Sequence, residues 1–242
     1  MDLKVMTYNI HHGKGTDQRI DLNRIAEVIK KSDAAIVGLT EVDKHFSERS
    51  DYEDQINLLS NYLDMDYAFA PSLTIKHKDS STDGHYGNAL LSRYPISTSK
   101  IYPFDFSSGF IEGRSILDAT VQVNKELVQI HVTHLSLVPF FQRMPINFMI
   151  KQLDNYAHPI IIMGDFNMFP GSNQWKKITS EFHDVWHVKG NGKGNTYPSN
   201  GPKRRLDYIF ASPHFEVMET EVESHIPIAS DHLPVKSLLR FK

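Results

Sequence analysis

The side chains best suited to chemistry lie in one short stretch, residues 160–167, where an apolar run gives way to polar residues. The run predicts a buried strand, and Gly164 after it permits a tight turn. Asp165 and Asn167 follow at the carboxyl end of that strand, where layered α/β proteins usually bind ligands. A carboxylate there can accept a proton or hold a metal ion, and an amide can donate to a charged oxygen. The structural alternative is an Asx-rich turn that ends a core strand.

Polar side chains recur at the ends of other predicted strands. Each alone has a plain structural explanation: His134 could be a hydrogen-bonded core histidine, and Asp207 could form an ion pair with Arg205. Their joint recurrence instead predicts a single site assembled from distant segments. The residues concerned are Asn9, Glu41, His134, Asp207, Asp231 and His232.

Hydrophobic spacing predicts the elements that must position these side chains. The predicted strands cover residues 3–10, 34–39, 86–93, 116–123, 127–135, 160–163, 206–211, 215–222 and 235–241. Asp21 and Ser172 are candidate helix N-caps, Pro145 is a candidate helix start, and a further helix is expected over residues 52–63. Residues 76–84 and 191–200 are expected to be loops. Without a repeat or a linker, we expect a single domain over residues 1–242, with packed sheets and helices outside them.

The composition limits the classes of protein and of site. Hydrophobic residues make up 40% of the 242, and the net charge of −3 gives no overall basic field for nucleic acid. The chain has no cysteine, so a metal site must use carboxylate, amide or imidazole ligands. The N-terminus runs directly into a strand pattern, and no apolar run reaches membrane-spanning length. We therefore expect a cytoplasmic monomer with no stable membrane insertion.

Seven short motifs, in order over nearly the whole chain, resemble the endonuclease/exonuclease/phosphatase superfamily. They are MTYN (6–9), GLTEVD (38–43), YGNALLSR (86–93), THL (133–135), GDFN (164–167), LDYI (206–209) and SDH (230–232). The resemblance implies an α/β fold of four layers, two packed mixed β-sheets flanked by helices. It also implies Mg²⁺-dependent phosphoester hydrolysis, with Mn²⁺ or Ca²⁺ as substitutes. Thr40 departs from the family, which usually has glutamine there; threonine can still donate one hydrogen bond but cannot reach as far.

The resemblance also suggests roles at a phosphodiester site, which must hold a cation, aim a water molecule and stabilise a charged transition state. Glu41 is the first expected metal ligand, and Asn9 and Asp231 are expected beside it, directly or through water. Asp165 and His232 are both candidates for the group that takes a proton from water. The sequence leaves the choice between these two open.

Further residues are expected to hold the substrate. Asn167 and His134 would contact phosphate oxygens, and by resemblance Asp207 would fix the tautomer of the candidate histidine base. Asn88 and Arg114 are softer candidates for substrate binding, and an ion pair with Glu112 is the alternative for the arginine.

Three other features each have two interpretations. His12 could face the cleft or be an exposed loop histidine. The basic run Lys203–Arg205 could attract phosphate or form a solvated surface. The apolar segment 138–148 could be an exposed lip for a lipid or a base, although we favour core and a helix start.

The leading prediction is a metal-dependent phosphoesterase with a phosphoester, most consistently a phosphodiester, as its substrate. A nuclease acting on DNA or RNA predicts a basic groove, whereas a lipid phosphodiesterase predicts an exposed apolar hairpin, for which residues 139–141 are a candidate. Outside the enzymes, a silent binding module on the same fold predicts missing catalytic residues. The full set is present here.

Overall fold

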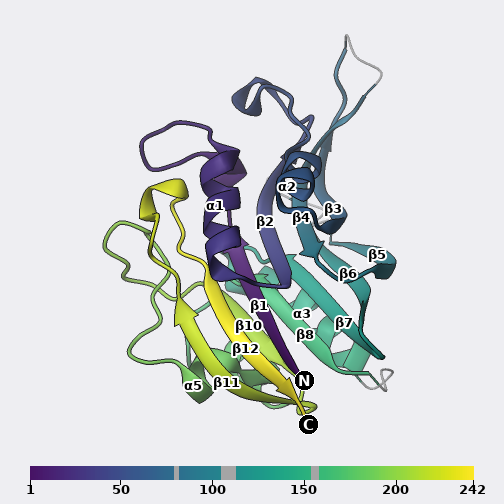
Figure 1. Ribbon diagram of the computed structural model, residues 1–242, viewed down its shortest axis with the longest axis vertical. Helices are drawn as coiled ribbons and strands as arrows, with labels where there is room; N and C mark the ends of the chain where they lie inside the picture. The colour runs from purple at the N-terminus through teal and green to yellow at the C-terminus, as the bar shows by residue number, and fades with distance from the viewer. Residues whose placement is uncertain (79–81, 105–112, 154–157) are drawn as a thin grey trace.

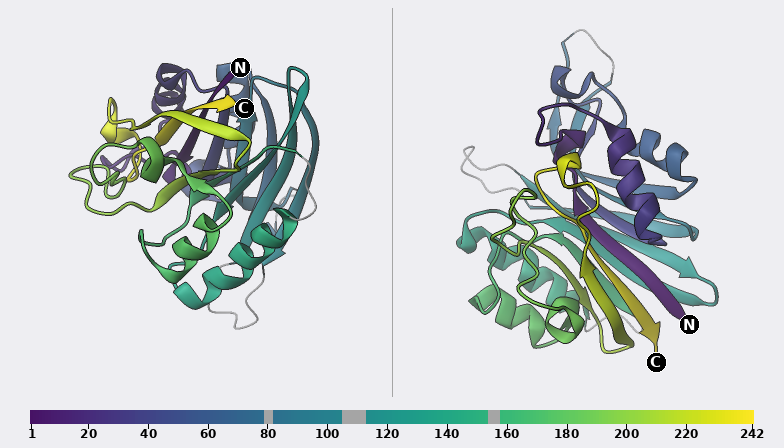
Figure 2. Two further views of the ribbon diagram at one scale, coloured as in Figure 1. Left: turned by 90° about the horizontal axis from the view of Figure 1, so that it is seen from below. Right: turned by 60° about the vertical axis from the view of Figure 1, so that its left-hand side comes forward.

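The computed structural model of this chain describes residues 1–78, 82–104, 113–153 and 158–242. Two six-stranded sheets pack face to face, and helices cover their outer faces (Figure 1, Figure 2). The predicted α/β fold of four layers is thus confirmed. Among the described residues, none of the helices combines the length and apolarity needed to cross a lipid bilayer.

The first sheet holds both ends of the chain, with strand order β11-β12-β1-β2-β4-β3. Its strands are β1 (Asp2–Asn9), β2 (Ile36–Lys44), β3 (Asp66–Ile75), β4 (Gly84–Ser92), β11 (Phe215–Val222) and β12 (Val235–Phe241). β1 and β2 are parallel, whereas β12 is antiparallel to β1. The two termini therefore lie together at one end of the sheet, away from the end where β1 finishes (Figure 1).

The second sheet has the order β5-β6-β7-β8-β10-β9. Its strands are β5 (Ile96–Phe104), β6 (Arg114–Val123), β7 (Glu126–His134), β8 (Ile160–Asp165), β9 (His183–Asp184) and β10 (Asp207–Ala211). β7 and β8 are parallel and end beside each other at His134 and Asp165. β10 is antiparallel to β8, which puts Asp207 directly opposite Asp165.

Three apolar clusters hold the layers together. The central one fills the space between the sheets, with fully buried Val5 from one sheet and Val132 from the other. Helices α1 (Leu22–Ser32) and α2 (Gln55–Leu63) pack on the first sheet through buried apolar residues such as Ile25 of α1. Helices α3 (Pro139–Leu153) and α4 (Asn173–Thr179) cover the second sheet through residues such as Ile146. The short helix α5 (Val185–Lys189) lies against β10 and β11.

The topology gathers the polar strand ends at one edge of the sandwich. The parallel strands β1, β2, β7 and β8 bring their carboxyl-terminal halves to this edge. The antiparallel strands β10 and β12 start there instead, so residues just before or at their beginnings join the same region. This is why segments that are far apart in the sequence can contribute to one site.

Several local predictions are confirmed and others are wrong. Asp21 and Ser172 accept hydrogen bonds from the first-turn amides of α1 and α4 as expected of N-caps. Pro145 lies inside α3 and does not start it, and β3, β5 and the short β9 were not predicted. The predicted loop at 76–84 includes residues 79–81, which lie outside the described residues.

The turn predicted at Gly164 is also wrong, because this glycine lies within β8. A Cβ atom built there would stand 1.8 Å from the backbone oxygen of Thr133 on β7, and the φ angle is +145°. Close approach of two strands, together with this backbone angle, therefore requires glycine at this position.

Candidate active site

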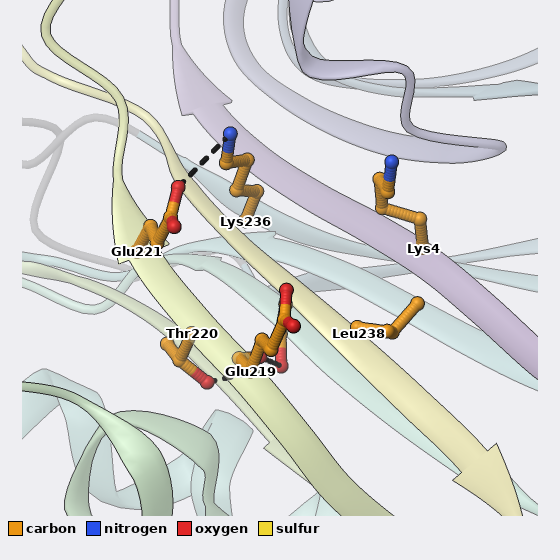
Figure 3. A pocket seen from close by; sticks show the side chains of 7 residues that line it. Lys4, Glu219, Thr220, Glu221, Lys236 and Leu238 are labelled. Atoms are coloured by element: carbon orange, nitrogen blue, oxygen red, sulfur yellow. Dashed lines mark hydrogen bonds and ion pairs between the residues drawn. The ribbon is translucent and has the colours of Figure 1, made fainter.

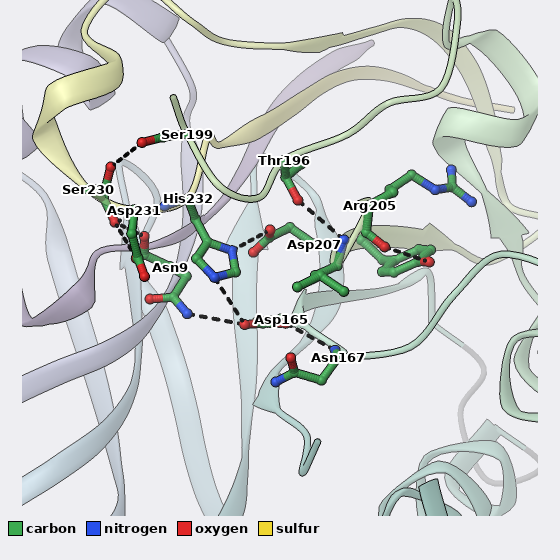
Figure 4. A network of polar contacts seen from close by, with 12 residues as sticks. Asn9, Asp165, Asn167, Thr196, Ser199, Arg205, Asp207, Ser230, Asp231 and His232 are labelled. Atoms are coloured by element: carbon green, nitrogen blue, oxygen red, sulfur yellow. Dashed lines mark hydrogen bonds and ion pairs between the residues drawn. The ribbon is translucent and has the colours of Figure 1, made fainter. Parts of the chain in front are cut away.

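The Asp165 carboxylate, which ends β8, is the centre of a buried polar cluster (Figure 4). Its Oδ2 accepts a hydrogen bond from Asn9 Nδ2 at 3.1 Å and lies 3.5 Å from His134 Nε2 and 3.7 Å from His232 Nε2. Its Oδ1 accepts from the backbone amide of Asn167 at 3.0 Å. Side chains from both sheets thus converge on one carboxylate.

His232 lies between two carboxylates. Its Nδ1 is 2.8 Å from Asp207 Oδ2, on the opposite side of the ring from Asp165, and the Tyr197 ring packs against it at 4.8 Å between centroids. The alternative ion pair between Asp207 and Arg205 is wrong, because Arg205 pairs with Asp184 at 2.7 Å. Tyr197 was not predicted as a site residue, because it lies in a segment expected only to be a loop.

Burial and neighbouring charge shift the protonation of these groups. Burial, helped by the nearby Asp207 charge, raises the pKa of Asp165 to about 7. Burial opposes the charged form of His232, but Asp207 and Asp165 outweigh it and raise the pKa of His232 to about 10. Burial, then the positive charges of Arg114 and His232, put the pKa of His134 well below its usual value. At neutral pH the cluster therefore contains a protonated His232 and a neutral His134.

Asn167 and His134 form a neighbouring pair of polar groups. Asn167 Nδ2 is 3.1 Å from His134 Nε2 and donates to the Leu135 carbonyl at 3.0 Å. The φ angle of Asn167 is +46°, a left-handed conformation that asparagine tolerates better than most residues. The structure thus brings the two predicted phosphate contacts side by side; their role stays a prediction.

A β-bulge presents the Glu41 carboxylate. The pairing of β2 with β4 changes register between Leu39 and Val42, and Glu41 within the bulge has a φ angle of +60°. Bulges of this kind re-aim a side chain out of the regular strand pattern. The predicted strand end at Glu41 is therefore wrong, since β2 continues to Lys44.

Asn9 connects Glu41 to Asp165. Its Nδ2 donates to Glu41 Oε1 at 2.9 Å as well as to Asp165, while its Oδ1 accepts the backbone amide of His11 at 3.0 Å. The pKa of Glu41 is raised by burial and lowered in part by the Asn9 hydrogen bond. In this orientation Asn9 holds carboxylates from the two sheets together. Its predicted role as a metal ligand would use Oδ1, which already accepts the His11 backbone amide.

Two histidines lie one residue beyond β1, in the short 3₁₀ turn η1 (His11–Gly13). One potential ligand atom from each of His11, His12 and Glu41 lies within 4.8 Å of the others, and His11 Nδ1 is 3.7 Å from Asp231 Oδ1. Burial, followed by the Arg49 charge, lowers the pKa of His12 to about 3. His12 was a candidate from the sequence and His11 was not, although both lie within three residues of Asn9, which was a usable signal.

A divalent cation fits the donors around Glu41. Glu41 and Asp231 offer carboxylate oxygens, and the buried Nδ1 atoms of His11 and His12 have no hydrogen-bond partner among the described residues. A second group, formed by Asp165, Asp207 and His232, is also compact. There, however, the protonated His232 ring already lies between the two carboxylates and offsets one negative charge.

Three remaining predictions have mixed outcomes. Asn88 is fully buried between the sheets and donates to the Ser115 carbonyl at 2.9 Å, so its substrate role stays a prediction. Arg114 is buried at the start of β6 and is close enough to lower the pKa of His134, whereas Glu112 lies outside the described residues. The Thr40 hydroxyl is buried with no hydrogen-bond partner among the described residues.

Two segments are divided between burial and exposure. In the run 203–205, Lys203 and Arg204 are exposed but Arg205 is buried in its ion pair. In the segment 138–148, Ile146 belongs to the core, whereas Phe140 is 66% exposed. The preference for core throughout this segment is therefore wrong at its amino-terminal part.

A hollow on the outer surface of the first sheet lies over β1, β11 and β12, away from this cluster (Figure 3). Lys236 crosses it and pairs with Glu221 at 3.1 Å and with Glu223 at 3.0 Å. Lys4 on the same surface pairs with Asp33. Lys236 thus pairs with one exposed and one buried carboxylate, and the hollow is lined by ion pairs among its own residues.

Comparisons with known proteins show the family and the fold of this chain. Residues 6–232 match the model of the endonuclease/exonuclease/phosphatase family. An uncharacterised protein of Escherichia coli K12, YbhP, is 26% identical over 86% of this chain and 83% of its own length. A family member from Beutenbergia cavernae has a TM-score of 0.81 at 26% identity, covering 99% of this chain and 72% of that one. A mannosyl-6-phosphatase of Bacteroides thetaiotaomicron shares the fold, with a TM-score of 0.77 at 18% identity over 99% of this chain and all of that one. The chain therefore belongs to the endonuclease/exonuclease/phosphatase family.

Proposed function

We propose that this protein is a divalent-metal-dependent phosphoesterase, with a phosphodiester as the substrate best suited to the site. The observation that carries the proposal is the convergence on Asp165 of Asn9, His134 and His232, within 3.1 to 3.7 Å of one oxygen. Such an arrangement suits a reaction in which a water molecule must lose a proton beside a negatively charged phosphate.

The cation would be held by Glu41 and Asp231, with Asn9 orienting the Glu41 carboxylate. When bound, a divalent cation supplies positive charge that neutralises phosphate oxygens. The remaining chemistry belongs to the side chains of this protein.

Asp165 is the proposed general base. Its pKa of about 7 allows it to be ionised at physiological pH and to accept a proton from the attacking water. His232, with its pKa raised to about 10, retains its proton and acts as a donor to a phosphate or leaving-group oxygen. Asp207 holds this ring through Nδ1, which fixes its orientation. Asn167, whose Nδ2 lies beside the neutral His134 ring, is the proposed donor to a phosphate oxygen.

The test is hydrolysis of bis-p-nitrophenyl phosphate and of p-nitrophenyl phosphate by purified protein, with Mg²⁺ or Mn²⁺ and then with EDTA. We expect hydrolysis that requires a divalent cation and is faster for the diester. A parallel assay on supercoiled plasmid distinguishes a nuclease from an enzyme for small phosphodiesters. Cation-independent hydrolysis, or none with any of these substrates, would contradict the proposal.

A second candidate, a lipid phosphodiesterase, is favoured by exposed apolar side chains that follow His134 and Asn167 along the chain. Leu137 is 74% exposed and Phe140 is 66% exposed. The other exposed members of this set, called here the apolar rim, are Val138, Met144 and Phe169. Exposed apolar groups beside a polar site often mark an interaction surface.

This candidate predicts sedimentation with phosphatidylcholine vesicles that is lost in the double variant Leu137→Ser, Phe140→Ser. Ile101→Ser is a matched control, because Ile101 is an exposed apolar residue on β5. If the double variant binds vesicles as the wild type does, or if the wild type does not bind, the lipid candidate is wrong.

A further inference from the structure

Two imidazoles lie beside the carboxylate that we propose as a cation ligand. His11 and His12 follow the end of β1, and each offers a ring nitrogen within 4.8 Å of the Glu41 oxygen and of the other. Asp231 approaches the same place from the opposite terminus of the chain, 3.7 Å from His11 Nδ1. The donors around this point are therefore two nitrogens and two carboxylates.

The backbone around these donors is strained in a consistent way. His11, His12 and Glu41 have φ angles of +45°, +44° and +60°, in the left-handed region that non-glycine residues rarely adopt. Such conformations persist only where the surroundings hold them. Here Asn9 Oδ1 accepts the His11 amide, and Gln55 donates to the His12 carbonyl at 2.8 Å. The held backbone brings both rings to Glu41.

A purely structural role does not account for the two rings. His12 is 8% exposed, and the buried Nδ1 atoms of both histidines have no hydrogen-bond partner among the described residues. Buried histidine nitrogens in a core are normally paired. Their lone pairs next to two carboxylates have the chemistry of metal ligands.

We propose that His11 and His12 bind the cation held by Glu41, and that the site therefore selects a divalent transition cation such as Mn²⁺ or Zn²⁺ over Mg²⁺. Imidazole nitrogen suits Fe²⁺, Ni²⁺, Cu²⁺ and Zn²⁺ best, and Mn²⁺ is the weakest of the first-row transition cations at such a site. Mg²⁺ is a hard cation that takes oxygen ligands. The inference deepens the proposed function, since it specifies the cation of the same site.

The test measures metal binding without substrate. Protein freed of metal is titrated calorimetrically with MnCl₂ and, separately, with MgCl₂, for the wild type, His11→Asn, His12→Asn and the double variant. Asparagine tolerates a left-handed backbone and replaces the nitrogen donor by an oxygen. His187→Asn, at an exposed histidine of α5, is the control for loss of an unrelated imidazole. Electron spin echo spectra of bound Mn²⁺ report directly whether ¹⁴N is coordinated.

We expect nitrogen modulation in the wild type and a loss of Mn²⁺ affinity of roughly 10–100-fold in the double variant, with Mg²⁺ affinity little changed. The selectivity for Mn²⁺ over Mg²⁺ then falls, while His187→Asn keeps it. Absence of nitrogen modulation, or equal loss of both affinities, would overturn the inference. If His12→Asn does not fold, the His11→Asn variant, at a half-exposed residue, and the wild-type spectrum still decide whether nitrogen is coordinated. Phosphoester hydrolysis without nitrogen coordination contradicts this inference alone, whereas coordination without hydrolysis contradicts the proposed function alone.

Discussion

At the scale of single residues, the question that the sequence left open is whether Asp165 or His232 accepts the proton. The two pKa values favour Asp165, because the histidine between two carboxylates holds its proton up to a pH of about 10. Asp165→Asn should therefore lower kcat by about 10³-fold or more with little change in KM, since an amide of the same shape cannot accept the proton. Single-turnover kinetics with saturating cation would measure this. If Asp165→Asn changes only KM and preserves kcat, Asp165 is not the general base.

The pH profile gives a second prediction at this scale. Asp165 must be ionised to act, and its pKa is raised to about 7, so kcat/KM should rise with pH through an apparent pKa near 7. The Asp207 charge helps to raise that pKa, so Asp207→Asn should move the rising limb to lower pH as well as reduce the rate. The measurement is kcat/KM between about pH 5 and about pH 9, which covers roughly two pH units on either side of the expected apparent pKa. A limb that moves to higher pH in Asp207→Asn would contradict the assignment.

Thr40, the one departure from the family motifs, gives a third prediction. Its hydroxyl is buried without a hydrogen-bond partner among the described residues, so Thr40→Val should leave the free energy of unfolding unchanged or raise it by up to ~1 kcal/mol. Thr196→Val is the control, because the Thr196 hydroxyl accepts from the Leu206 amide and its loss should cost ~1–3 kcal/mol. Urea denaturation compares the two variants. Equal destabilisation by both would show that Thr40 has a polar partner.

At the scale of elements, the sequence predicted the buried strands and the edge strand β11, but missed the other edge strands, β3, β5 and the two-residue β9. β8 and β10 are buried along their whole length and read as continuous apolar runs. β3 lies at one edge of the first sheet and β5 at one edge of the second; β5 is largely exposed and β3 only partly buried, so they carry little of the alternation that identifies a strand. The bulge at Glu41 could not be predicted from the sequence either, because it depends on the pairing of β2 with β4, a later segment of the chain.

Gly164 supplies the prediction for an element, since it fixes the approach of β8 to β7. An alanine Cβ would stand 1.8 Å from the Thr133 oxygen, so Gly164→Ala should destabilise the fold by more than ~3 kcal/mol or prevent folding. Gly171→Ala is the matched control: Gly171 also has a positive φ angle, but a Cβ there meets nothing within 4 Å. It should cost only ~1 kcal/mol. Thermal unfolding of the two variants measures the difference, and similar melting temperatures would mean that β7 and β8 separate easily.

At the scale of the whole molecule, the candidate site lies across the sandwich. Asn9 and Glu41 come from the first sheet, whereas His134, Asp165 and Asp207 come from the second. The motifs could identify these residues, but their distances depend on how two sheets pack, which no local pattern encodes. His11 was missed for a different reason: its contact with Glu41 depends on the turn after β1 and on the bulge in the neighbouring strand β2.

Because the Asn9 amide joins carboxylates of both sheets, cation binding at Glu41 should stabilise the entire fold. A ligand that binds only the folded state at 100 times its dissociation constant adds about 2.7 kcal/mol. For a chain of this size, that corresponds to a rise in Tm of roughly 5–10 °C. Differential scanning calorimetry with Mn²⁺ should show this rise, and EDTA should reverse it. Glu41→Gln should show no cation-dependent rise, because it removes the carboxylate at the bulge. An equal rise in Glu41→Gln would mean that the cation binds elsewhere. No rise in the wild type would mean that a cation adds nothing to the contact that Asn9 makes with Glu41 and Asp165.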